Sequence, residues 1–156
     1  MEIMNKNNHH YMGIQMNIET WNLLDKKDRN QQEDLRMINF AKASLYHWRK
    51  SNKYELVNEQ RGQWLLSRVY SFLGKADEAL FHAKETLKIT KEQDLKDFDL
   101  AYAYESMARA YAASNNKDES IKWLEKAKES GDLIKDDKDK EYFISDLESE
   151  PWFNIK

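Results

Sequence analysis

The chain has 156 residues, with 25 basic and 28 acidic side chains and a net charge of −3, a size that fits one domain or one array of repeats. Four glycines and one proline are too few for the turns of a β-sandwich or barrel, so we expect an all-α protein. The lack of cysteine excludes disulfides, thiolate metal sites and cysteine nucleophiles. The chain has no basic block typical of nucleic-acid binding and no apolar run long enough for a membrane span.

Hydrophobic spacing predicts seven helices with short connections. We expect them at about 15–27, 31–50, 54–73 and 76–93, with two more between 98 and 131 and a last one over about 137–149. Residues 1–14 are polar and rich in asparagine and are expected to form a flexible tail, which leaves 15–156 as a single domain. The tail has no apolar run of the signal-peptide type, so we expect a cytoplasmic protein.

The middle of the chain contains an internal repeat. Segment 67–80 aligns with segment 108–121 at a shift of 41 residues, and the shift superimposes identical residues at several positions, namely Arg68 on Arg109, Tyr70 on Tyr111 and Asp77-Glu78 on Asp118-Glu119. The same shift places Gly74 on Asn115, and glycine and asparagine are the residues that best tolerate a left-handed turn. We therefore expect two copies of one helical hairpin.

The repeat unit resembles a tetratricopeptide repeat (TPR). The first copy matches the family pattern at Leu66, Ser67, Tyr70, Gly74, Glu78, Ala79 and Leu80, and the second at Tyr104, Met107, Ala108, Tyr111, Glu119 and Ile121. The departures are Gln63 in the large-residue position, the missing proline at the end of each unit and the period of 41 rather than 34 residues. Nearly the whole chain after residue 18 also resembles a set of short bacterial TPR-type proteins. The resemblance implies an antiparallel array with a degenerate unit at 15–52, repeats at about 54–93 and 98–131, and a capping helix at about 137–149.

Stacked hairpins of this kind share a core and leave a concave groove along the first helix of each unit. The repeat register places seven candidate partner-binding residues there: Arg61, Trp64, Arg68, Phe72, Tyr102, Glu105 and Arg109. Two guanidinium groups at equivalent positions, Arg68 and Arg109, suit a carboxylate, a phosphate or an acidic peptide. The alternative is structural pairing, because Glu105 precedes Arg109 by one helical turn.

The other chemistry-bearing side chains are interpreted as structural. His82 has Glu78 and Glu85 one turn away on its helix, but no matching set on another helix completes a metal site. His47 has no such neighbour, and His9-His10 form only a weak chelating pair in the expected tail. The aspartates at 132–139 surround a helix start, where they are expected to cap it. Trp152 and Phe153 are expected to fold back on the last helices, with docking into a second copy as the alternative.

These observations favour a non-enzymatic scaffold or adaptor that binds a protein or peptide partner in its groove. The alternative is a structural or regulatory module whose groove is closed by its own helices or by homodimerisation. No enzyme signature, cofactor site or metal site is predicted, and neither a nucleic acid nor a membrane is expected as a partner.

Overall fold

The computed structural model describes residues 5–155, which form seven α-helices and no strand. The helices are α1 (Lys6–Leu24), α2 (Gln31–Lys50), α3 (Leu56–Phe72), α4 (Ala76–Glu92), α5 (Phe98–Ala113), α6 (Lys117–Asp132) and α7 (Asp137–Glu148). The predicted all-α class and the seven-helix array are therefore confirmed for this part of the chain.

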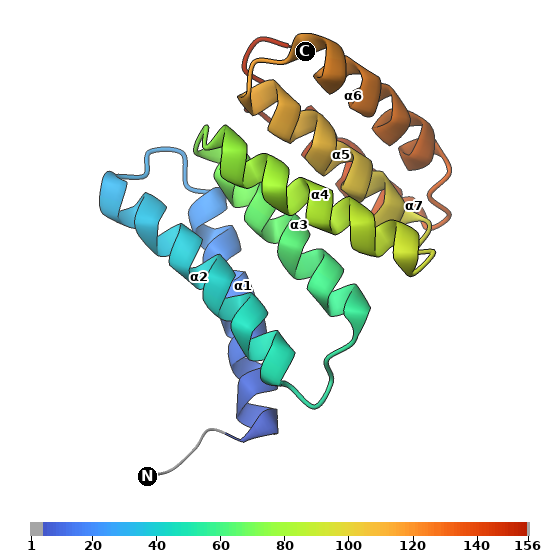
Figure 1. The fold of residues 1–156 in the computed structure, drawn as a ribbon. Helices are drawn as coiled ribbons and strands as arrows, with labels where there is room; N and C mark the ends of the chain where they lie inside the picture. Colours follow the sequence, from blue (N-terminus) through green and yellow to red (C-terminus); the bar gives the residue numbers. More distant parts are fainter. Residues whose placement is uncertain (1–4, 156) are drawn as a thin grey trace.

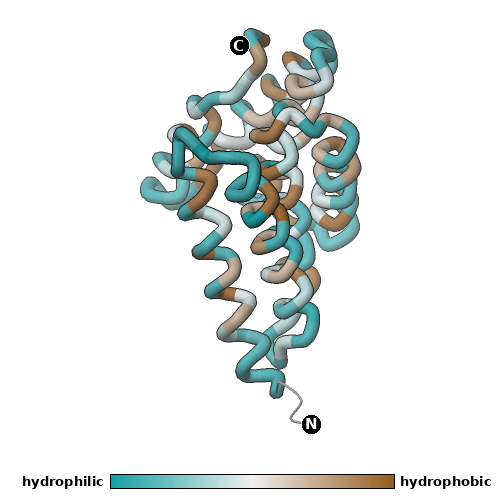
Figure 2. Tube along the Cα trace, turned by 90° about the vertical axis from the view of Figure 1, so that its left-hand side faces the viewer, coloured by the Kyte–Doolittle hydropathy of each residue, from teal (hydrophilic) through white to brown (hydrophobic). Residues whose placement is uncertain are grey.

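Consecutive helices pair as antiparallel hairpins that stack side by side (Figure 1). The first helices of the three hairpins, α1, α3 and α5, form one layer, and α2, α4 and α6 form the other. The last helix, α7, packs on α5 and α6. Apolar positions recur at intervals along each helix instead of forming one long run (Figure 2), as amphipathic helices require. We call the surface of α1, α3 and α5 that faces away from the second layer the groove face.

The two predicted repeat copies have the same turn geometry. Gly74 and Asn115 both adopt left-handed backbone conformations, with φ of 69° and 60°. In both copies the residue after this position donates its backbone N–H to the aligned tyrosine, at 2.9 Å to Tyr70 O and 3.0 Å to Tyr111 O. A serine also links the two helices of each hairpin, from Ser67 Oγ to Ala79 O and from Ser120 Oγ to Ala108 O. The 41-residue shift therefore relates equivalent structural positions.

The first helix corrects the expected tail at 1–14, because α1 begins at Lys6; residues 1–4 lie outside the described part of the chain. The Asn5 side chain caps α1 by accepting from Asn8 N at 2.8 Å. Packing against α2 holds the rest of this segment: Ser44 Oγ donates to Gly13 O at 2.7 Å. A Cβ added to Gly13 would lie 2.9 Å from the Trp48 ring, so glycine permits this close approach. Tertiary packing thus makes a helix of residues whose composition indicates a tail.

The end of the chain folds back on its own helices, as expected for Trp152 and Phe153. Trp152 is 1% exposed and belongs to the core cluster that includes Phe143 and Leu147. Its Nε1 donates to Leu147 O at 2.9 Å, and its ring centre lies 4.2 Å from Arg109 Cζ. Phe153 approaches the turn at Gly74. The C-terminal segment is therefore part of the folded domain.

Candidate functional site

The two arginines predicted to line the groove, Arg68 of α3 and Arg109 of α5, share one carboxylate. Arg109 Nε lies 2.6 Å from Glu105 Oε1, and Arg68 Nη1 lies 3.4 Å from the same oxygen. Trp64 Nε1 donates to the other carboxylate oxygen at 3.2 Å. The exposed fractions of Arg68, Glu105 and Arg109 are only 4%, 1% and 1%. Because buried charges persist only when they are paired, Glu105 is what allows both arginines to lie here.

The end of α7 and the residues after it cover this cluster. Arg109 donates to three backbone carbonyls, those of Asp146 at 2.9 Å and of Ser149 and Pro151 at 3.0 Å. Arg68 Nη2 reaches Ser149 Oγ at 3.2 Å and Asp146 Oδ1 at 3.7 Å. A cation is favourable at the carbonyl end of a helix, and the guanidinium is shaped to bind several oxygens at once. The groups that were candidates for an external anion are thus occupied by the chain itself.

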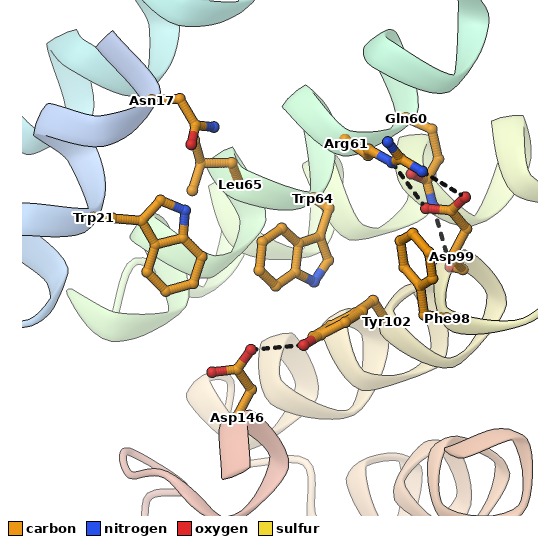
Figure 3. A pocket seen from close by; sticks show the side chains of 10 residues that line it. All are labelled: Asn17, Trp21, Gln60, Arg61, Trp64, Leu65, Phe98, Asp99, Tyr102 and Asp146. Atoms are coloured by element: carbon orange, nitrogen blue, oxygen red, sulfur yellow. Dashed lines mark hydrogen bonds and ion pairs between the residues drawn. The ribbon is translucent and has the colours of Figure 1, made fainter. Parts of the chain in front are cut away.

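An aromatic cavity of about 260 Å³ opens where α1, α3 and α5 approach one another (Figure 3). Its aromatic walls are Trp21, Trp64, Phe98 and Tyr102. The Trp21 and Trp64 rings are stacked with centroids 5.9 Å apart, and Tyr102 meets Trp64 edge-on at 5.0 Å. Such a concave, largely apolar site is the usual form of a binding pocket for an apolar group.

The charged groups and the Tyr102 hydroxyl around this cavity are already paired. Arg61 forms two hydrogen bonds to the Asp99 carboxylate, at 3.1 and 3.2 Å, and its guanidinium lies over the Phe98 ring. The Tyr102 hydroxyl donates to Asp146 Oδ2 at 2.7 Å. Burial, together with this hydrogen bond to a carboxylate, raises the pKa of Tyr102, so the phenol stays neutral. The cavity therefore presents no free charge to a ligand.

A second cavity of about 290 Å³ adjoins the first along α1. The two share Asn17 and Arg61 as lining residues, and the second adds Ile14, Ile18 and Trp48. A third cavity of about 600 Å³ begins on the other side of Trp21 and is bordered mainly by charged residues from 25–29 and 146–150. The open part of the groove face thus runs along α1, with its apolar section at the two smaller cavities.

The seven predicted groove residues have different surroundings in the structure. Arg61, Trp64 and Tyr102 line the aromatic cavity, and Arg68 and Phe72 line the third cavity. Glu105 and Arg109 lie buried beneath the C-terminal segment.

Sequence reasoning missed the contribution of α1, which supplies Asn17 and Trp21 to the cavity, and it also missed Phe98. A signal for α1 exists, because Ile14, Ile18 and Trp21 recur at helical spacing on one face. It was obscured by the expectation that the helix begins at residue 15. Phe98 begins α5, at a boundary where helical spacing carries no information.

The histidines all contact neighbouring side chains. His82 Nδ1 lies 2.6 Å from Gln63 Oε1, and its ring stacks on Tyr70. Burial, with a smaller effect of nearby Lys42 and Arg49, lowers the pKa of His82 to about 4. His47 Nδ1 lies 2.8 Å from Nδ1 of His9, which α1 places there and not in a tail. Within residues 5–155, no group of three or more His, Cys, Asp or Glu side chains could hold a metal ion.

No family model, curated protein or solved structure matches the chain. Among the described helices, none combines the length and the apolar character needed to cross a membrane. The chemistry of the groove face is therefore the basis for a functional proposal.

Proposed function

We propose that the chain is a non-enzymatic scaffold or adaptor of the TPR-like class, acting in the bacterial cytoplasm, that binds a protein or peptide partner on its groove face. The single observation that carries this proposal is the aromatic cavity formed by Trp21, Trp64, Phe98 and Tyr102. These side chains come from three helices, and all four are half-buried: each packs against the core on one side and borders the open space on the other. Aromatic anchors of this kind contribute much of the free energy of protein binding.

A polypeptide suits this surface better than a small polar metabolite. The cavity offers apolar walls, and the carboxamide of Asn17 at its edge makes no hydrogen bond with any of the described residues. It also continues along α1 into a second apolar space. A peptide carries side chains one after another along its length, so two apolar side chains of one peptide can occupy both cavities.

The alternative function is that of a structural or regulatory module whose groove is closed by its own helices or by homodimerisation. The observation that favours it is the occupation of Arg68 and Arg109 by Asp146, Ser149 and Pro151. This closure involves the α5 side of the groove face, whereas the aromatic cavity stays open. Closure of one part is therefore compatible with binding at the other.

A displayed library of random peptides, selected on the immobilised protein, tests the proposed function. We expect selected peptides to bind wild type and to lose about tenfold or more in affinity with Trp21→Ala, because an aromatic wall is removed. Phe81→Ala is the matched control, since Phe81 is a 59% exposed aromatic side chain on α4, outside the cavity. Circular dichroism confirms that both variants are folded. If no peptide is selected, or if Trp21→Ala binds as wild type does, the closed module is the better description.

A further inference from the structure

We propose that the open part of the groove binds an extended, uncharged segment of a partner protein, with apolar side chains i and i+2 in the two neighbouring cavities. The peptide group between these side chains would hydrogen-bond to the Asn17 carboxamide. This inference rests on the proposed function and specifies the conformation and chemistry of the ligand.

The charged groups next to the two smaller cavities indicate an uncharged ligand. Arg61 is paired with Asp99, and Arg68 is paired with Glu105 and Asp146. The guanidinium of Arg68 also lies over aromatic rings, 5.4 Å from the centre of the Trp21 ring and 5.5 Å from that of Trp64. A cationic ligand would compete with this guanidinium for the rings, and an anionic ligand would have to break an existing ion pair. A neutral apolar segment complements the surface without either cost.

Asn17 indicates that the ligand backbone is extended. Its half-buried carboxamide makes no hydrogen bond with any described residue, although it stands at the junction of the two cavities. Figure 3 shows that it projects from α1 on the same side as Trp21, toward Leu65 of α3. A carboxamide can donate to a peptide carbonyl and accept from a peptide N–H. An extended ligand has both groups free, whereas the interior of a helix satisfies them internally.

The two cavities suit side chains that alternate along an extended chain. Their volumes are about 260 and 290 Å³, and a cavity of roughly 150 Å³ is enough to hold a benzene ring. Each therefore accepts one large apolar side chain. Successive residues of an extended chain point to opposite sides, so residues i and i+2 lie on one side about 6.6 Å apart with a peptide group between them. Asn17 and Arg61 border both cavities, so in the proposed complex that peptide group passes next to them.

The test uses blocked, uncharged hexapeptides that carry leucine and phenylalanine in a serine and alanine background. The two apolar residues, tried in both orders, are spaced i,i+2, i,i+3 or i,i+4, and binding is measured from the change in tryptophan fluorescence. We expect the i,i+2 peptides to bind at least fivefold more tightly than the others. A further i,i+2 peptide has its central amide nitrogen methylated, which removes the donor that Asn17 would meet. Methylation should weaken binding to wild type about tenfold.

Variants of Asn17 separate the carboxamide from the apolar walls. Asn17→Leu should bind the unmethylated peptide about tenfold more weakly, and methylation should cause no further loss in this variant, because both changes remove the same hydrogen bond. Asn22→Leu is the matched control, since Asn22 is an exposed asparagine on the same helix and does not line either cavity. It should bind as wild type does.

The outcomes distinguish this inference from the proposed function. Tighter binding of the i,i+3 or i,i+4 peptides, or unchanged binding by Asn17→Leu, overturns the extended ligand but keeps peptide binding. If replacing a serine of the i,i+2 peptide by lysine makes the peptide bind more tightly, the ligand is not neutral and this part of the inference is wrong. If no peptide binds and the protein self-associates in sedimentation experiments through the α1 face, a second copy is the occupant and both proposals fail.

Discussion

The two ends of the groove face have opposite surroundings. At the α5 end, Arg68, Glu105 and Arg109 are buried and covered by α7 and the residues that follow it. At the α1 end, Asn17 and Trp21 border open cavities. The helices that form both ends belong to the same stack of hairpins. What covers the face, and not the repeat itself, therefore decides whether a position contributes to stability or is available for binding.

Arg68 stands at the boundary between the two ends. Its Nη atoms bind Glu105 and Ser149 on the covered side, whereas its guanidinium plane meets Trp21 on the open side. A change to the covered cluster therefore alters a wall of the open cavity. The two ends are expected to differ in function but not to be independent, and substitutions at each end test this comparison.

The largest expected effect comes from Glu105→Gln at the covered end. The substitution keeps the shape and an acceptor for Trp64 but removes the charge between two buried guanidinium groups. Leaving buried charges uncompensated costs about 3–5 kcal/mol, so the free energy of unfolding measured with urea should fall by that amount. The cavity at the α1 end should also lose affinity for peptides, because Arg68 is no longer held.

Asp94→Asn provides the matched control for removal of a carboxylate. The Asp94 side chain is 83% exposed and pairs with Lys96 at 3.5 Å, and asparagine tolerates its positive φ of 50°. Exposed pairs contribute at most about 1 kcal/mol. If Glu105→Gln and Asp94→Asn have the same free energy of unfolding, the buried cluster does not stabilise the fold and the prediction is wrong.

Mild acid should act first on the two hairpins formed by α1 to α4, because all four histidines lie there, at positions 9, 10, 47 and 82. The pKa of His82 is lowered by burial to about 4 in the folded protein, against about 6.5 in an unfolded chain. The unfolded state therefore binds more protons between these values, and stability decreases as the pH falls. Because solvent partly screens the His82 ring, the expected loss is at most about 2 kcal/mol between pH 7 and pH 5. Burial and the neighbouring His9 also lower the pKa of His47, which adds a loss of the same sign.

Urea unfolding at pH 7 and pH 5 measures this effect, and hydrogen exchange locates it. His82→Gln removes the titrating group and keeps a partner for Gln63, so its stability should depend less on pH than that of wild type. Exchange in acid should rise first in α1 to α4 and only later in α5 to α7. Equal protection in both parts, or an unchanged pH dependence in His82→Gln, would contradict the prediction.

Most of the fold followed from the sequence because hydrophobic spacing and turn residues act locally. The stops at Gly74 and Asn115 were predicted from their tolerance of left-handed backbone, and both have positive φ. The start of α1 was not predictable in this way. It depends on Gly13 contacting Trp48 and on His9 contacting His47, contacts between residues more than 30 positions apart.

The candidate site was predictable only in part, for the same reason. The repeat register placed Arg68 and Arg109 on one face, and it left open whether they bind a ligand or pair structurally. Their actual partners include Ser149 and Pro151, which belong to neither repeat copy. A periodic pattern cannot indicate which non-repeated segment will cover it, so the open cavity had to come from the three-dimensional arrangement.

The smallest change in stability is expected for a substitution of Ile18 at the open end. This substitution distinguishes the open end from the core. Ile18 of α1 is 46% exposed and lines the second cavity, whereas Ile38 of α2 is 8% exposed in the core. Ile18→Ser should change the free energy of unfolding by less than about 0.5 kcal/mol, since little apolar surface is lost from the core. Ile38→Ser, the same change at a buried position, should cost about 3 kcal/mol or more.

If Ile18→Ser keeps its stability and weakens binding of the i,i+2 hexapeptide severalfold, α1 carries a surface maintained for a ligand. If it destabilises the fold as Ile38→Ser does, the second cavity is part of the core, and the contrast between an open and a covered end does not hold.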